Sequence, residues 1–211
     1  SIIYQNNLYV GLSNGIYKLP LAHRGEISLA QANFTPVTNA GGQAWGMNVV
    51  NGKLLLGRHE GAFEVREDQI IPIATDKGYW NFLSYNHPKP LVLSGNYNGI
   101  SIFDGNKQKF YPVGNVGRFN ESARFVLADG NNVWVSHPYK GIYKIVLSNL
   151  RTTNVQLYTN KKGLPSTFNN HIYRVKGKIV AGTEKGIYEY NPKSDRFEVS
   201  PSFVLIFGKK Y

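Results

Sequence analysis

The sequence predicts an all-β protein, specifically a β-propeller of about five four-stranded blades. One pattern recurs five times: an apolar strand, a tight turn that ends in glycine, and a strand that opens on an apolar residue. Those glycines lie at positions 15, 61, 99, 141 and 186, so successive steps are 46, 38, 42 and 45 residues. A period of about 40–45 residues with four strands per unit is typical of propeller blades. No helical stripe competes with this pattern.

The last copy shows the blade most clearly. Its expected strands are His171–Val175, Lys178–Ala181, Ile187–Tyr190 and Arg196–Val199. Val, Ile and Tyr favour strands, and the intervening Gly, Asn and Pro favour turns. The glycine before the third strand is expected to adopt positive φ, which it reaches without a Cβ penalty.

The other blades follow in chain order. The expected blades are 1–38, 39–75, 76–114, 115–159 and 160–201, with 202–211 starting a further blade. Outside the recurring hairpins, the first blade should contain strands 1–5 and 34–38 and a polar loop over 21–33. The second blade should contain strands 44–50, 53–58, 62–66 and 70–74. The third should contain strands 79–85, 91–94, 100–103 and 109–113. The fourth should contain strands 122–128, 133–136, 142–146 and 155–158.

The end of the chain bears on the size of the ring. The apolar run 202–207 has strand length and reads as the inner strand of a sixth unit. A propeller must close its ring or leave sheet edges exposed. We therefore favour part of a six- to eight-bladed ring over five blades that close with this run, and we expect the chain to be a piece of a longer protein.

Composition limits the chemistry. The chain has no cysteine, which excludes disulfides and thiolate metal sites. Its net charge is +11, but the 24 Lys and Arg residues are scattered, which favours a solvated surface over nucleic acid; an acidic glycan is the next alternative. No apolar segment approaches the roughly 20 residues of a membrane span, so no membrane contact is expected. No cofactor is expected either.

A ligand site is expected around the central channel. The loops between blades, and those between second and third strands, open on that face. The candidate ligand-binding residues are Trp45, Arg58, Tyr79, Trp80, Asn96, Tyr97, Arg124, Tyr139, Asn169 and His171. Flat aromatic rings suit the C–H faces of a sugar, and arginine and amide groups suit its hydroxyls. The competing interpretation is structural: the tryptophans fill space between blades, and the histidines are ordinary loop residues.

The segment before the last blade resembles a known repeat. Gly163-Leu-Pro-Ser166, Gly182-Thr183 and Gly186-Ile-Tyr188 are similar to the motifs of the two-component regulator propeller repeat, and weaker copies keep the glycine and aromatic frame along the whole chain. Gly-Leu-Pro-Ser and Gly-Thr each occur only once, which departs from the family pattern. The resemblance implies a non-catalytic periplasmic sensor module of a hybrid histidine kinase that responds to glycan fragments. It also implies a larger receptor chain that works as a homodimer.

Two other functions stay open from the residues alone. A propeller lyase or hydrolase would use a channel histidine such as His171 or His59 with a metal ion. A protein-interaction scaffold would use a flat propeller face. The leading hypothesis is a sensor module that binds a small polar ligand, an oligosaccharide.

Overall fold

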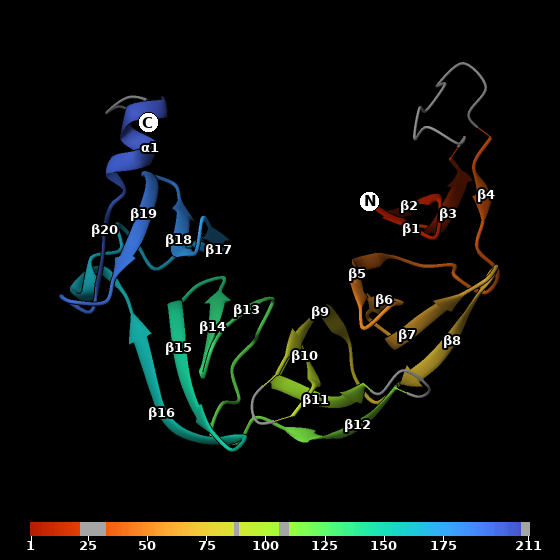
Figure 1. Ribbon diagram of the computed structural model, residues 1–211, viewed down its shortest axis with the longest axis horizontal. Coiled ribbons are helices and arrows are strands. Elements are labelled where there is room, and N and C mark those ends of the chain that lie inside the picture. The colour runs from red at the N-terminus through yellow and green to blue at the C-terminus, as the bar shows by residue number, and fades with distance from the viewer. Residues whose placement is uncertain (22–32, 87–88, 106–109, 208–211) are drawn as a thin grey trace. The chain divides into compact units, whose positions relative to one another are not determined.

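The computed structural model describes residues 1–21, 33–86, 89–105 and 110–207 (Figure 1). Within these ranges the chain forms five sheets of four strands each, and the strands of every sheet neighbour one another in chain order. This is the arrangement that the repeat predicts, so each sheet is called a blade below. The chain divides into two compact units: the first is Ser1–Tyr85, Pro90–Tyr97 and Ser101–Gly114, and the second is Asn86–Lys89, Asn98–Ile100 and Asn115–Tyr211.

The first three blades lie mainly in the first unit. Blade one is β1 (Ile2–Tyr4), β2 (Asn7–Leu12), β3 (Gly15–Pro20) and β4 (Thr35–Pro36). Blade two is β5 (Ala44–Val50), β6 (Lys53–Arg58), β7 (Gly61–Arg66) and β8 (Gln69–Ala74). Blade three is β9 (Tyr79–Tyr85), β10 (Leu91–Asn96), β11 (Gly99–Gly105) and β12 (Phe110–Asn115). The predicted bounds of β5, β6 and β9 are confirmed to the residue.

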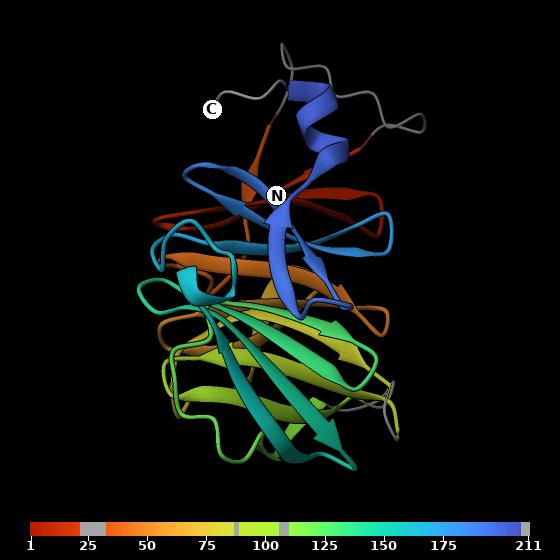
Figure 2. The same ribbon diagram turned by 90° about the vertical axis from the view of Figure 1, so that its left-hand side faces the viewer.

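The last two blades lie in the second unit. Blade four is β13 (Phe125–Asp129), β14 (Asn132–His137), β15 (Gly141–Ser148) and β16 (Arg151–Tyr158). A 3-10 turn, η2 (Asn160–Lys162), leads to blade five: β17 (His171–Val175), β18 (Lys178–Thr183), β19 (Gly186–Asn191) and β20 (Arg196–Val199). Figure 2 shows how strongly the strands of blade four (green to teal) fan out, as the right-handed twist of strands requires.

The recurring glycine has two physical reasons. Each copy opens a third strand with positive φ, for example 110° at Gly141, as the sequence predicts. The structure adds a close approach, because a Cβ on Gly141 would lie only 2.2 Å from the carbonyl oxygen of Tyr158 at the end of β16. A Cβ on Gly61 would lie 2.3 Å from the carbonyl oxygen of Ala74 at the end of β8. In blades two and four, the third and fourth strands meet at this point only if the third begins with glycine.

The core lies in layers between neighbouring blades. One layer joins blades one and two through Tyr9, Ile16, Leu54, Leu56 and Phe63, all at most 9% exposed. Another joins blades four and five through Trp134, Tyr158, Ile172, Ile179 and Phe197. Burying apolar surface on both faces of a sheet is the main force that holds such stacks together. Phe63 and Tyr188 pack between blades as predicted.

The end of the chain corrects one prediction. The run 202–207, expected as a strand, lies in the helix α1 (Pro201–Phe207). Proline suits the first turn of a helix, and the N–H of Val204 donates to the carbonyl oxygen of Ser200 at 3.1 Å. A strand would need a neighbouring strand for its backbone groups, whereas a helix satisfies them internally. Periodicity alone does not separate the two for so short an apolar run. The ring of six to eight blades stays a prediction.

The polar loop expected over residues 21–33 lies almost wholly outside the described residues. Of the helices in the described part of the chain, none is long and apolar enough to cross a membrane.

Candidate functional site

The first unit gathers four aromatic side chains at one end of blades two and three. Trp45 stacks on Trp80 with ring centroids 5.6 Å apart, and the ring of Tyr97 meets the Trp80 ring edge-on at 4.9 Å. His59 lies 5.7 Å from Trp45, and its Nδ1 is 3.1 Å from the hydroxyl of Tyr97. We call Trp45, His59, Trp80 and Tyr97 the aromatic cluster. It joins three of the predicted ligand residues.

A β-bulge aims Trp45 into this cluster. Ala44 pairs with Arg58 and Gly46 pairs with Gly57, so Trp45 is an extra residue without a partner on β6. A bulge turns a side chain out of the regular alternation of a strand. The Nε1 of Trp45 is held by the Oε1 of Gln43 at 3.3 Å, which fixes the indole from its polar edge.

A second irregularity positions Trp80. Tyr79 pairs with Asn96 and Phe82 pairs with Ser94, so two residues of β9, Trp80 among them, face one residue of β10. Both tryptophans therefore owe their direction to a break in strand register. Such breaks are found near functional sites more often than elsewhere in sheets.

Glycines make room for the cluster. A Cβ on Gly46 would lie 2.0 Å from the carbonyl oxygen of Trp80, so only glycine lets β9 approach β5 this closely. A Cβ on Gly78 would lie 2.8 Å from the Cζ3 of Trp45 and 3.1 Å from the Cε2 of Tyr97. Gly78 therefore forms part of the wall of the aromatic cluster.

The cluster combines apolar faces with polar edges. Tyr97 is 42% exposed, and the two tryptophans are partly buried. Exposed aromatic rings that are grouped together on a protein surface often mark a binding site, whereas single exposed apolar side chains are common and need no such explanation. Flat rings of this kind suit the C–H faces of sugars, and the polar atoms of His59 and Tyr97 at their edge can take part in hydrogen bonds.

Three other predicted ligand residues of this unit are buried and have partners within the chain. Arg58 is 7% exposed, contacts the carbonyl oxygen of Gly41, and lies 3.1 Å from the carboxylate of Glu60. Tyr79 is 1% exposed and donates to Asp76 at 2.9 Å, and burial raises its pKa well above the ordinary value. Asn96 is 1% exposed and its Nδ2 donates to Ser101 at 3.0 Å.

The second unit brings three other predicted residues to one crevice. This crevice of ≈ 40 Å³ is lined by Arg124, Phe125, Ser136, Pro138, Asn169, Asn170 and His171. The rings of Phe125 and His171 meet edge-on at 4.6 Å, and the guanidinium of Arg124 lies 5.7 Å from the centre of the Phe125 ring. Phe125 begins β13 and His171 begins β17, so the crevice lies where the inner strands of blades four and five start.

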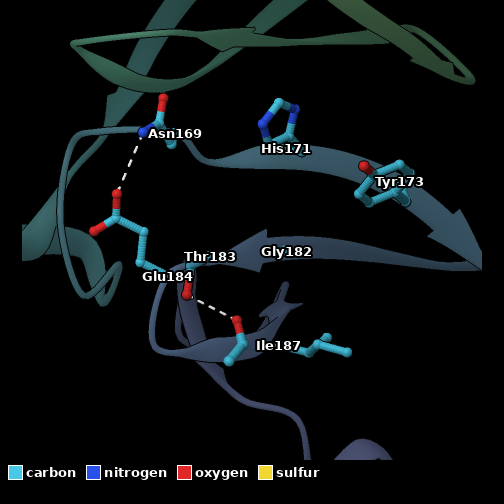
Figure 3. Close-up of a pocket in the computed structure, with 8 residues that line it drawn as sticks. Asn169, His171, Tyr173, Gly182, Thr183, Glu184 and Ile187 are labelled. Carbon is cyan, nitrogen blue, oxygen red and sulfur yellow. Dashed lines mark hydrogen bonds between the residues drawn. The ribbon is translucent and has the colours of Figure 1, made fainter. Parts of the chain in front are cut away.

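A wider hollow adjoins the crevice on blade five. It has a volume of ≈ 550 Å³ and shares Asn169 and His171 with the crevice. Figure 3 shows His171 and Tyr173 along β17, with the Nδ2 of Asn169 donating to Glu184 Oε1 at 3.3 Å. Tyr173, Gly182 and Ile187 give this hollow an apolar floor.

The fourth predicted residue of this unit, Tyr139, does not line the crevice, although the preceding Pro138 does. It is 68% exposed, and its ring lies 6.3 Å from His137. The Nδ1 of His137 accepts hydrogen bonds from the backbone N–H groups of Tyr139 and Lys140, each at 3.1 Å. His137 therefore orders this turn, and burial lowers its pKa although the nearby Glu121 opposes the shift.

Sequence reasoning left out some residues of these sites. His59 and Asn170 belong to the expected channel-face loops but not to the candidate ligand residues, His59 is named only for the enzyme alternative, and Gly78 has no signal of its own. The neighbouring His59-Glu60-Gly61 turn offered a hint for His59, because the equivalent turns of other blades carry His137 and Tyr97. In the described ranges, no three His, Asp or Glu side chains are grouped closely enough to hold a metal ion.

Comparison with known proteins identifies the fold. No protein-family model matches the chain, and no curated protein matches its sequence. Among solved structures, the WD40 β-propeller domain of Doa1 is similar with a TM-score of 0.63 and 14% identity, over 94% of this chain and 67% of that one. The CNH domain of AfRom2 is similar with a TM-score of 0.63 and 14% identity, over 90% and 66%.

A third similar structure is a receptor domain. It is the extracellular domain of the putative one component system BT4673 from B. thetaiotaomicron, with a TM-score of 0.66 and 15% identity. The match covers 93% of this chain and 29% of that domain, so this chain spans under a third of it. Identities this low establish the fold alone. The chain has the β-propeller fold, as the sequence predicts.

Proposed function

We propose that this chain is a non-catalytic ligand-sensing module of an extracytoplasmic signalling receptor, and that it binds an oligosaccharide through the aromatic cluster. The observation that carries the proposal is the cluster itself: two tryptophans, a tyrosine and a histidine meet at two register breaks, partly exposed. A tryptophan that served only the core would be buried, like Trp134, which is 1% exposed.

The sugar chemistry follows from the cluster's two kinds of surface. The stacked indoles of Trp45 and Trp80 offer a flat apolar face for the C–H side of a pyranose ring. The paired His59 and Tyr97 groups can donate to and accept from hydroxyls beside that face. Flat rings lose little conformational entropy on binding, so a preformed cluster favours affinity.

The receptor role draws on two supports. The Gly163-Leu-Pro-Ser166 and Gly186-Ile-Tyr188 motifs resemble the two-component regulator propeller repeat, and one similar structure is an extracellular domain of a signalling system. A periplasmic location and a homodimeric receptor belong to the same proposal. The lyase or hydrolase alternative needs a metal ion, and the described residues contain no group of three His, Asp or Glu side chains that could hold one.

The test is a binding screen with matched variants. Oligosaccharides are added to the chain and the melting temperature is measured, because a ligand well above its dissociation constant stabilises the folded state. Hits are then titrated calorimetrically against Trp80→Ala and Tyr97→Ala. Tyr111→Ala is the control, since Tyr111 is 40% exposed and Tyr97 is 42% exposed.

The proposal predicts a loss of at least about tenfold in affinity for both cluster variants and no change for the control. Equal binding by Trp80→Ala and the unchanged chain would refute the site. Turnover of a glycan that requires His171 and stops with a chelator would refute the non-catalytic role.

A further inference from the structure

The crevice of the second unit contains a buried acceptor with no donor. Asn170 is 1% exposed, and its Nδ2 donates to the carbonyl oxygen of Ser166 at 2.9 Å. This bond fixes the orientation of the amide, because the flipped form would place the Oδ1 of Asn170 against the carbonyl oxygen of Ser166. The Oδ1 of Asn170 then has no hydrogen-bond partner among the described residues. A buried acceptor without a donor is unfavourable, so a bound group with a donor is expected here.

Ser136 supplies a donor in the same crevice. It is 2% exposed, and its Oγ accepts the backbone N–H of Ile172 at 2.8 Å. In the described part of the chain, its own O–H donates to no other group. A ligand hydroxyl both donates and accepts, so it can satisfy Asn170 and Ser136 together. The crevice volume of ≈ 40 Å³ has room for a hydroxyl group, because a cavity of about 10–15 Å³ already holds one water.

Arg124 adds a positive charge at the same crevice. No carboxylate of the described residues pairs with its guanidinium, which lies 5.7 Å from the centre of the Phe125 ring. Arginine binds carboxylates through two parallel hydrogen bonds and is suited to this role by its planar fork. Glu184, which would repel an anion, accepts from Asn169 in the adjoining hollow and does not line the crevice.

We propose that this crevice binds a sugar that bears a carboxylate, a uronate residue. One hydroxyl enters the crevice between Asn170 and Ser136, and the carboxylate pairs with Arg124. The sugar ring then lies near the edge-on pair of Phe125 and His171. The inference rests on the proposed function only in taking a sugar as ligand; its residues belong to the other unit and none of them is in the aromatic cluster.

The experiment uses histidine NMR, since each site contains one histidine. The chain is labelled with ¹³C-histidine, and the His59 and His171 signals are assigned with His59→Gln and His171→Gln. Methyl β-glucuronide is titrated in, with methyl β-glucoside as the uncharged match. The variant is Arg124→Gln, and Arg151→Gln is the control because Arg151 is also an exposed arginine of this unit.

The proposal predicts that the glucuronide shifts the His171 signal and the glucoside does not at the same concentration. Arg124→Gln should weaken binding at least about tenfold, and Arg151→Gln should leave it unchanged. The inference is overturned if the glucuronide leaves His171 unmoved up to about 50 mM, well above a weak dissociation constant of about 1 mM. It is also overturned if the two sugars bind alike or if Arg124→Gln binds as tightly as the unchanged chain.

The two proposals fail separately. Oligosaccharide binding that shifts His59, with no glucuronide effect at His171, would overturn this inference and leave the aromatic cluster standing. If the glucuronide shifts the His171 signal and no oligosaccharide shifts the His59 signal, the aromatic cluster is overturned as a binding site and this inference stands.

Discussion

Asp195 joins four donors in the second unit, and its replacement tests how blade five is held. Its carboxylate accepts from Gln156 at 2.7 Å, Tyr158 at 2.6 Å, Lys162 at 2.6 Å and Tyr190 at 2.8 Å. These residues come from β16, η2 and β19, so the carboxylate ties blade four to blade five. Asp195 has φ of 51°, a conformation that asparagine also tolerates. Asp195→Asn therefore changes the charge and keeps the backbone.

The expected loss follows from the contacts. Asparagine can keep the bonds of one oxygen and loses those of the other, which here come from Gln156 and Lys162. Hydrogen bonds to a charged group contribute about 1.5–3 kcal/mol each. The side chain of Asp195 is 38% exposed, so water screens and partly replaces these bonds. We expect a loss of roughly 2–3 kcal/mol in the free energy of unfolding.

Urea denaturation followed by circular dichroism measures this loss, with Asp68→Asn as the control. Asp68 pairs with Lys18 but is 71% exposed, and such surface pairs contribute about 0–1 kcal/mol. Burial raises the pKa of Asp195, but the bonds from Lys162, Tyr158, Gln156 and Tyr190 outweigh it and hold the pKa well below its ordinary value. The stabilisation is thus complete above the unfolded pKa of about 3.9 and is lost as pH falls below it. The gap between the unchanged chain and Asp195→Asn should narrow below about pH 4. A loss no larger than that of Asp68→Asn, or a gap at pH 2.5 as large as the gap at pH 7, would refute the reasoning.

Three further predictions concern single positions. Gly163→Ala should lower the free energy of unfolding, measured in urea, by roughly 3 kcal/mol or more, because its Cβ would lie 1.9 Å from the carbonyl oxygen of Phe197. Gly177→Ala, also at positive φ but with no atom within 4 Å, should lower it by only about 1 kcal/mol. Equal losses would contradict the close approach. Burial lowers the pKa of His137, so its contribution to stability is complete above the unfolded pKa of about 6.5 and is lost as pH falls below it. His137→Asn keeps an acceptor for the turn, and its urea midpoint should fall less between pH 7 and pH 5 than that of the unchanged chain; parallel profiles would exclude this role. Gly78→Ala should displace the rings of Trp45 and Tyr97 and weaken oligosaccharide binding in calorimetry. Gly41→Ala, whose Cβ would meet no atom within 4 Å, should leave the binding unchanged. Unchanged binding by Gly78→Ala would show that the wall of the cluster is not rigid.

The Gly163-Leu-Pro-Ser166 motif illustrates how the structure explains a pattern that the sequence only displays. Gly163 has φ of 90° and ends η2, and Leu164 is 2% exposed in the layer between blades four and five. The carbonyl oxygen of Ser166 holds the amide of Asn170. The motif therefore delivers the chain to β17 with the crevice residues already oriented.

The sequence alone determined the blades, because local chemistry decides them. Strand-forming residues between glycine, asparagine and proline turns fix where each hairpin begins and ends, and the recurring glycine fixes the period. The bounds of β5, β6, β9, β17 and β20 needed nothing more.

Only the tertiary structure decided which candidate residues meet. Arg58, Tyr79 and Asn96 lie on the expected loops or strand ends but have partners in the interior, while Trp45 and Trp80 reach the surface because a register break turns each out of its strand. A register break depends on how two strands pair, which no single strand encodes. The helix α1 differs from the predicted strand for a similar reason, because a short apolar run becomes a strand only where a neighbouring strand can complete its hydrogen bonds.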